Sequence, residues 1–361
     1  MTHSYTSDDK SALQAISDAQ RIAFAPIIFQ ATVALRELGV LACLDSKRRS
    51  GATADEVAEE CAISLYGAKV LLDASLSIGL VWQREAHYVL AKTGHFILHD
   101  PMTNINLDFN RDFCYQGVAA LTESIRSGKP EGLKVFGDWP TLYPGLSSLP
   151  EPARSSWFAF DHYYSDHAYP EVLPLVFERP ITRLLDIGGN TGKWALACIE
   201  QDPAVRVTVA DLPQQLSLMK DNIASHSDKE RIDDYAIDWL DEQQTPPAGA
   251  EAIWMSQFLD CFSPAQILSI LRRVAKVMES NTRLFIMETL WDRQPQEAGA
   301  LSLNCTSLYF TAMANGNSRM YAADELVSLI EQAGLRVSHQ HDRLGRGHTL
   351  LVCERAGQSS W

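Results

Sequence analysis

The sequence predicts an α/β protein with a mostly helical N-terminal part and a C-terminal part built on a parallel sheet. Apolar side chains recur mainly at helical spacing over residues 11–125. From residue 183 onward, short apolar runs typical of strands alternate with amphipathic runs typical of helices. The chain has 361 residues, 46% of them hydrophobic, which suits two domains with a core each.

The N-terminal part predicts a helix over residues 24–38, followed by segments bounded by residues that cap helices. The predicted boundaries are Gly39, Thr53, Ser64 and Gly79. Residues 80–82 and 88–90 then predict two short strands around a polar turn. Helix, turn, helix and hairpin in this order are the arrangement of a winged helix.

The charge of this part argues against DNA binding. Residues 1–100 hold nine basic and twelve acidic side chains, and the predicted recognition helix at 65–78 has one Lys and no Arg. The net charge of the whole chain is −14. Duplex binding needs several phosphate contacts from basic side chains. We therefore expect a packing or dimerisation module, and a winged-helix regulator that senses a ligand is the least favoured alternative.

Residues 101–180 are rich in proline and aromatic side chains and predict helices that flank a loop. We expect this region to bridge the two domains. The predicted organisation is a winged-helix-like dimerisation domain at 1–110, a helical linker and substrate-cleft region at 111–180, and a nucleotide-binding type of α/β domain at 181–361.

The C-terminal part alternates between the two kinds of element. Strands are predicted at 183–187, 205–210, 253–256, 284–289, 335–340 and 349–354, and helices at 194–200, 216–225, 264–278 and 323–333. Such alternation predicts a parallel sheet covered on both faces. Ligands of these sheets bind at the carboxyl ends of the strands, near a switch in strand order.

The strongest motif lies at residues 185–192, where a predicted strand runs into a glycine-rich turn and then a helix. Asp186, Gly188 and Gly192 form the pattern D-x-G-x-x-x-G. Glycines allow the backbone to pass close to a ligand. Asp211 lies 25 residues after Asp186, at the end of the next predicted strand, where an acid can accept hydrogen bonds from both ribose hydroxyls.

The spacing excludes two common nucleotides. A loop for ATP or GTP would carry Lys followed by Ser or Thr, but Trp194 follows Lys193, and a dinucleotide loop would carry Gly where Asn190 stands. The pattern instead matches a nucleoside without phosphates, S-adenosylmethionine. Asp238 and Trp239 would bond and stack on its adenine.

Residues 184–192 and 209–213 resemble the class I S-adenosylmethionine-dependent O-methyltransferases of the plant and hydroxyindole type. The resemblance implies a Rossmann-like S-adenosylmethionine-binding domain after an N-terminal, mostly helical winged-helix dimerisation domain. It also implies a homodimer and methyl transfer to a hydroxyl of a small organic molecule, with a phenol of secondary metabolism as the expected acceptor. The cofactor-binding residues it implies are Asp186, Gly188, Gly192, Asp211, Leu212, Asp238, Trp239 and Ser256.

One part of the family pattern differs. Asp260 stands where the family places a catalytic His, and Glu288 matches the supporting acid on the next strand. Asp260 could act as a base if burial raises its pKa, orient the acceptor, or cap a helix. His162 is another candidate base. The family's cleft regions imply acceptor contacts from Tyr164, His167, Tyr309, Met313 and Asn317.

Other expectations concern what the chain lacks. The seven cysteines form no C-x-x-C pair, and His162 and His167 lie five residues apart, so no metal site and no disulfide are expected. No apolar run reaches 18 residues and the N-terminus is polar, so we expect a cytoplasmic protein with no membrane or nucleic-acid partner. A relative that binds the cofactor without methylating, as a decarboxylase, hydroxylase or pericyclase, is the main alternative.

Overall fold

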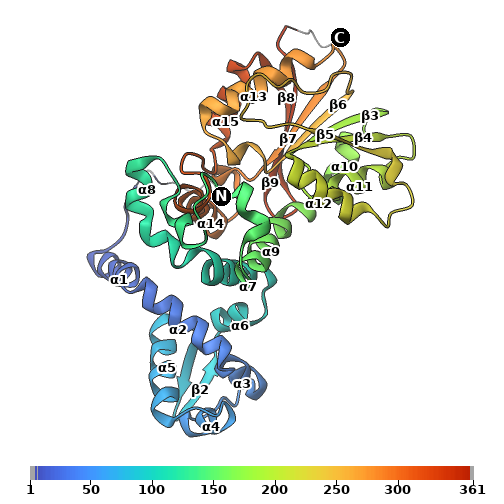
Figure 1. Cartoon of the computed structure of the whole chain (residues 1–361). Helices are drawn as coiled ribbons and strands as arrows, with labels where there is room; N and C mark the ends of the chain where they lie inside the picture. The colour runs from blue at the N-terminus through green and yellow to red at the C-terminus, as the bar shows by residue number, and fades with distance from the viewer. Residues whose placement is uncertain (1–4, 6, 358–361) are drawn as a thin grey trace. The chain divides into compact units, whose positions relative to one another are not determined.

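A computed structural model describes residue 5 and residues 7–357, which form two compact units that divide between Phe113 and Cys114 (Figure 1). The sequence analysis predicted this division near residue 110. The region at 114–180 clusters with the C-terminal unit. Each unit is described below by itself.

The N-terminal unit combines helices with a small hairpin. The helices are α1 (Ala12–Ala23), α2 (Ala25–Glu37), α3 (Val40–Lys47), α4 (Ala54–Glu60), α5 (Leu65–Ile78), α6 (Lys92–His99) and α7 (Pro101–Phe109), and a π-helical turn, η1 (Asn110–Cys114), follows. The strands β1 (Val81–Arg84) and β2 (His87–Leu90) pair antiparallel. The order α4, turn, α5, hairpin confirms the predicted winged-helix arrangement.

The predicted helix boundaries are confirmed. The Thr53 hydroxyl accepts a hydrogen bond from the Glu56 amide, and the Glu56 carboxylate accepts one from the Thr53 amide, so the two residues form a capping box. The Ser64 hydroxyl caps α5 through the Gly67 amide. Gly39 and Gly79 have φ of 75° and 78°, a conformation that favours glycine.

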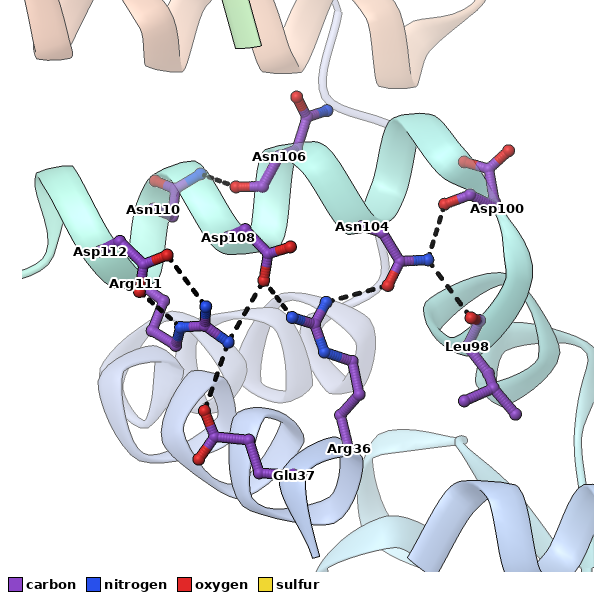
Figure 2. A network of polar contacts seen from close by, with 10 residues as sticks. All are labelled: Arg36, Glu37, Leu98, Asp100, Asn104, Asn106, Asp108, Asn110, Arg111 and Asp112. Carbon is purple, nitrogen blue, oxygen red and sulfur yellow. Dashed lines mark hydrogen bonds and ion pairs between the residues drawn. The ribbon is translucent and has the colours of Figure 1, made fainter. Parts of the chain in front are cut away.

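A network of polar side chains joins α2 to α7 and η1, as Figure 2 shows. The Arg36 guanidinium donates to the Asn104 side chain over 2.9 Å and forms an ion pair with Asp108. Arg111 contacts the same Asp108 carboxylate at 3.2 Å and Glu37 at 3.2 Å. These bonds hold α7 against the helix that carries the apolar core residue Leu35.

The C-terminal unit is built on a seven-stranded sheet with the order β5-β4-β3-β6-β7-β9-β8. Its strands are β3 (Arg183–Ile187), β4 (Arg206–Asp211), β5 (Ile232–Ala236), β6 (Ala252–Ser256), β7 (Arg283–Glu288), β8 (Leu335–Leu344) and β9 (His348–Arg355). The strands from β5 to β7 are parallel, whereas β9 runs antiparallel between β7 and β8. After β3 the chain adds β4 and β5 toward one edge of the sheet, and it then returns to place β6 on the opposite side of β3. The switch in strand order therefore lies between β3 and β6.

Helices cover both faces of this sheet (Figure 1). On one face lie α10 (Tyr169–Val176), α11 (Lys193–Gln201) and α12 (Pro213–Ile223), and on the other α13 (Pro264–Val277) and α15 (Ala323–Gln332). The unit also contains α8 (Leu121–Ser127), α9 (Ala153–Asp166) and α14 (Glu297–Tyr309). Successive residues of β3 enter opposite cores: Leu184 packs with α10, α11 and α12, and Leu185 packs with α13 and α15. This period of two places Asp186 on the α11 face.

The structure also corrects parts of the strand prediction. The sequence predicted a parallel sheet, but a single turn of three residues, 345–347, with two glycines, separates β8 from β9, and such a short link permits only antiparallel pairing. The edge strand β5 was missed because four of its five residues are exposed and carry no apolar run. The seven cysteines are free, as expected. No single helix in the described ranges is long and apolar enough to cross a membrane.

Candidate active site

A hollow of about 540 Å³ opens at the switch in strand order, beside the carboxyl ends of β3 and β6. The glycine-rich loop after β3 lines it on one side, and Ser256 and Gln257 line it at the end of β6. Asp161 and His162, both on α9, complete this wall. The position is the one expected for a ligand site in an α/β sheet.

The glycines of the loop are required by close approach. A side chain at Gly188, whose φ is 71°, would collide with the Phe258 ring, and one at Gly189 would collide with the Asp186 carboxylate. Gly192 has φ of 78° and stands at the N-cap of α11, against Met219. The loop therefore packs closely on its neighbours only because these three positions carry no side chain.

Asp186 is a buried acid with an unused oxygen. Its side chain is 1% exposed, and its Oδ2 has no hydrogen-bond partner among the described residues. Burial, and to a smaller extent the nearby Asp211, raise the pKa of Asp186 to about 8. A cationic or hydrogen-bond-donating ligand in the hollow would therefore find an acceptor that the protein leaves free.

Asp211 ends β4 and ties the loop to that strand. Its Oδ2 accepts a hydrogen bond from the Asn190 amide over 3.0 Å, and its Oδ1 accepts one from the Leu212 amide over 2.7 Å. Burial raises the pKa of Asp211, while these two amides act in the opposite direction. The geometry brings the predicted pair Asp186 and Asp211 together, with Leu212 beside them.

Sequence reasoning missed Asp161, which the structure places on the hollow. The Asn190 side-chain amide donates to Asp161 Oδ2 over 3.2 Å, and Lys193 forms an ion pair with Asp166 at 2.6 Å. Both contacts link α9 to the glycine loop. The acids stand in an aromatic and histidine-rich stretch, and that composition was the available signal.

The other predicted cofactor residues differ in their burial and in their contacts. Ser256 and Gln257 line the hollow, and the Ser256 hydroxyl is a buried atom with no partner in the described part of the chain. Trp239 is 4% exposed and packs its ring against Phe258, with centroids 5.9 Å apart. Asp238 is exposed and accepts a hydrogen bond from the Leu240 amide. Adenine contact by these last two residues stays a prediction.

Asp260 and Glu288 form a second buried acidic group. Asp260 lies in a short 3₁₀ turn, η6 (Leu259–Cys261), is 5% exposed, and accepts a weak hydrogen bond from the Cys261 thiol. Glu288 ends β7, and its Oε1 accepts hydrogen bonds from the amides of Phe258 and Leu259. Its Oε2 has no partner among the described residues. Glu288 therefore holds the turn that carries Asp260.

Burial dominates the electrostatics of this pair. It raises the pKa of Asp260 to about 7, and the charge of Asp161 contributes in the same direction. Burial and the charge of Asp260 raise the pKa of Glu288 well above its ordinary value. An aspartate with a pKa near neutrality can exchange a proton at physiological pH, which an ordinary exposed aspartate does poorly.

Polar side chains surround Cys261. The buried Asn315 amide donates to the Cys261 carbonyl over 2.9 Å, to the Ser318 hydroxyl over 2.7 Å, and to the Tyr143 hydroxyl over 3.3 Å. Its oxygen accepts from the amides of Asn317 and Ser318. Asn317, the predicted acceptor contact, is exposed. The buried amide next to the acidic pair is therefore Asn315, two residues earlier.

The remaining predicted acceptor residues separate into buried and exposed sets. The Tyr309 hydroxyl accepts a hydrogen bond from Trp157 Nε1 over 2.8 Å. Met313 is fully buried in a π-helical turn, η8 (Phe310–Ala314), against the backbone of Gly117. His167 is exposed, and its ring bonds the Tyr163 carbonyl rather than facing the hollow.

Two candidates on α9 complete the set. His162 lines the hollow, with its ring stacked on Phe158 at a centroid distance of 6.0 Å. Tyr164 lies in the same helix, but its side chain is outside the described residues. His162 therefore remains a second candidate base, next to the cofactor hollow and not next to Glu288.

Comparison with protein families identifies both units. Residues 17–88 match the Dimerisation2-like domain, and residues 168–336 match the O-methyltransferase domain. The second match contains the glycine loop, Asp260 and Glu288, whereas Asp161 and His162 of the hollow precede it.

Individual proteins with similar sequences are also methyltransferases. The chain is 22% identical to L-tyrosine C(3)-methyltransferase of Streptomyces lavendulae, over 87% of this chain and 85% of the relative. It is 26% identical to 3-hydroxy-5-methyl-1-naphthoate 3-O-methyltransferase of Streptomyces sahachiroi, over 70% and 73%. The apo structure of the S-adenosylmethionine-dependent methyltransferase SibL is similar in fold, with a TM-score of 0.73 and 24% identity, over 94% of this chain and 99% of that one.

Proposed function

This chain belongs to the S-adenosylmethionine-dependent O-methyltransferase family, and from that premise we propose that it methylates a hydroxyl of a small aromatic molecule. The observation that carries the proposal is the glycine-loop hollow, which is lined by Asp186, with an Oδ2 that has no partner among the described residues, and which lies beside Asp211 at the end of the next strand. Both acids lie where a nucleoside-type ligand binds an α/β sheet.

The residues present fit S-adenosylmethionine. This cofactor carries positive charge on its sulfonium and amino groups, and three acids, Asp161, Asp186 and Asp211, gather at the hollow. A bound positive charge would favour the ionised form of Asp186, which holds its proton at pH 7 in the unliganded protein. Asp186 Oδ2 is a buried acceptor for the amino group, directly or through water, and Asp211 suits the ribose hydroxyls. When bound, S-adenosylmethionine supplies an electrophilic methyl group.

Asp260 is the residue we assign to removal of the acceptor proton. A phenol has a pKa of about 10, and a base that titrates near neutrality is better matched to it than an ordinary carboxylate. The pKa of Asp260 is about 7, and Glu288 fixes its turn through two backbone amides. Tyr143 and Asn315 lie on the other side of Cys261 and would help to orient the acceptor.

The charges around Asp260 favour a particular class of acceptor. The charge of Asp161 raises the pKa of Asp260, and the acids around Cys261 raise the pKa of its thiol. Arg319 forms an ion pair with Glu325. A carboxylate on the acceptor would add negative charge to a buried acidic site. We therefore expect neutral or amine-bearing phenols to be better acceptors than aryl carboxylates.

Self-association is proposed for the N-terminal unit. The α1–α2 segment exposes large apolar side chains, with Leu13 78%, Ile22 76% and Ile27 66% exposed. Apolar patches of this kind mark interaction sites, and the family match names a dimerisation domain. A homodimer in the cytoplasm is the state we expect, and light scattering on the purified protein tests the mass.

Calorimetric titration with S-adenosylmethionine tests the cofactor assignment. We expect micromolar binding that weakens at least about tenfold, or about 1.4 kcal/mol, in Asp211→Ala. Asp221→Ala, which removes an exposed acid from α12, is the matched control and should bind like the parent chain. Equal binding by all three proteins would contradict the assignment.

An activity screen against a panel of phenols, with the products analysed by mass spectrometry and NMR, tests the reaction. A product heavier by one methyl group supports methyl transfer, and NMR places that group on oxygen or on a ring carbon, the position named for the L-tyrosine C(3)-methyltransferase relative. Turnover of acceptors without methyl gain would instead support a decarboxylase, hydroxylase or pericyclase. Asp260→His, which restores the family's residue, should keep activity if the position acts as a base.

A further inference from the structure

A group of possible metal ligands lies on the N-terminal unit, away from the methyltransferase domain in the chain. Asp45 comes from the last turn of α3, and His95 and His99 come from α6. One ligand atom from each of the three side chains lies within 4.8 Å of the others. Among the described residues, no other three His, Cys, Asp or Glu side chains meet this condition.

The helix itself sets the spacing of the two histidines. Residues four apart in a helix lie on the same face, one turn apart. The rings of His95 and His99 accordingly have centroids 4.5 Å apart. An i, i+4 histidine pair on one helix face is an arrangement that proteins use to bind zinc.

The third ligand faces this pair from a different helix. Asp45 Oδ2 lies 2.8 Å from His99 Nε2, and Asp45 Oδ1 lies 3.6 Å from His95 Nδ1. Ligands at about 2.0–2.1 Å in a tetrahedral zinc site stand roughly 3.4 Å from one another. The observed separations bracket that value, so small rotations of exposed side chains are enough to admit the ion.

The exposure and chemistry of the group suit a metal better than a structural ion pair. The side chains of His95, His99 and Asp45 are 58%, 46% and 37% exposed. Exposed ion pairs contribute little to stability, and such exposure leaves the ligand atoms open to a metal ion from solution. Two imidazoles and one carboxylate are the donor set of many catalytic and surface zinc sites.

We propose that Asp45, His95 and His99 form a binding site for a divalent transition-metal ion, with zinc as the preferred occupant. The bound ion joins α3 to α6 and so ties two helices of the N-terminal unit together. Three protein ligands leave at least one position for water or for another ligand. The sequence prediction of no metal rested on the cysteines and on His162 and His167. It missed this group because Asp45 lies 50 or more residues before the two histidines in the chain.

The test is a calorimetric titration of the full-length, untagged and chelator-stripped protein with zinc chloride, at slightly alkaline pH. We expect one ion per chain with a micromolar Kd, and a higher Tm in the presence of zinc. Cobalt(II) titration should add visible absorption bands of a four- or five-coordinate site. His99→Ala and the nearly isosteric Asp45→Asn should each weaken binding at least about tenfold.

A second histidine pair, with one ring exposed and one half-buried, supplies the control. His339 and His341 lie on β8 with ring centroids 6.4 Å apart and no third ligand among the described residues. His339→Ala should bind zinc like the parent chain. Equal affinity in parent, His99→Ala and Asp45→Asn, or no binding by the parent at about 100-fold the expected Kd, would overturn the proposal and leave a hydrogen-bonded His–Asp pair only.

Discussion

The unpaired acid of the glycine loop should destabilise the protein that binds no ligand. Asp186 is 1% exposed, its Oδ2 has no partner among the described residues, and its pKa is raised to about 8. We predict that Asp186→Asn makes the unliganded protein more stable at pH 7 and at the same time weakens S-adenosylmethionine binding. A loss of function joined to a gain of stability is typical of active-site residues.

The size of the effect follows from the pKa of Asp186. In the unfolded chain this carboxyl has an ordinary pKa of 3.8 and ionises, whereas in the folded protein at pH 7 it holds its proton. The gap between that ordinary value and pH 7 is about three pH units, and each unit corresponds to about 1.4 kcal/mol. Burying the acid therefore costs about 4 kcal/mol. A buried amide without a partner costs about 1–3 kcal/mol, so the net gain is about 1–3 kcal/mol.

The pH dependence has a defined sign. The folded protein binds more protons at Asp186 than the unfolded chain does between about pH 4 and pH 8. The free energy of unfolding of the parent therefore falls across this range as pH rises. Asn does not titrate, so the advantage of Asp186→Asn should grow from about pH 5 to about pH 8 and then level off.

Urea unfolding of both proteins at several pH values, without cofactor, measures this difference. Asp211→Asn is the matched control, because the Asp211 carboxylate accepts two backbone N–H groups and an amide oxygen replaces only one acceptor. Burial also raises the pKa of Asp211, but the two amides oppose that shift, so this variant should gain less stability at pH 7 than Asp186→Asn. The reasoning is refuted if Asp186→Asn is less stable by the same amount from about pH 5 to about pH 8.

Further predictions concern the other parts of the site and the N-terminal unit. With an acceptor in hand, kcat/KM should rise with pH through about 7, as Asp260 loses its proton, and Asp260→Asn should lower it about 10²- to 10⁴-fold and flatten the profile. S-adenosylmethionine binding at pH 7 should release a proton from Asp186, seen as a heat that changes with the ionisation enthalpy of the buffer. Gly189→Ala should weaken cofactor binding at least about tenfold in calorimetry, because its Cβ would collide with the Asp186 carboxylate. Arg36→Met should lower the free energy of unfolding of the N-terminal unit by about 1–3 kcal/mol in thermal unfolding, because Asp108 and Asn104 lose their shared donor (Figure 2).

The sequence predicted most of the regular elements because their signals are local. Capping residues such as Thr53 and Ser64 bond backbone groups three residues away, so a short window contains both partners. Strand β3 was predicted with its observed bounds, because apolar side chains on both faces make a continuous run. The edge strand β5 is exposed along four of its residues and carries no such run, so only its pairing with β4 defines it.

In the cofactor site, too, the features set by short spacing were predicted and the contacts between distant segments were not. Gly188, Gly192 and Asp186 lie within one turn of chain, so their spacing alone indicated a loop that passes close to a nucleoside. Asp161 could not be placed in this way, because it reaches the loop through the Asn190 side chain from a helix far earlier in the sequence. Asn315 likewise meets Cys261 only because η8 folds back onto the turn after β6.

By itself, the sequence determined the class of fold, the glycine loop with its two acids, and the presence of Asp260 after the predicted strand at 253–256. These features depend on residue type and on short spacing. The tertiary structure decided what those acids can do, because a pKa depends on burial and on charges brought from other elements. Asp260 has a pKa of about 7 since β7 sets Glu288 beneath its turn and α9 brings Asp161 near it. The histidine pair of α6 became a candidate metal site only because α3 places Asp45 against it.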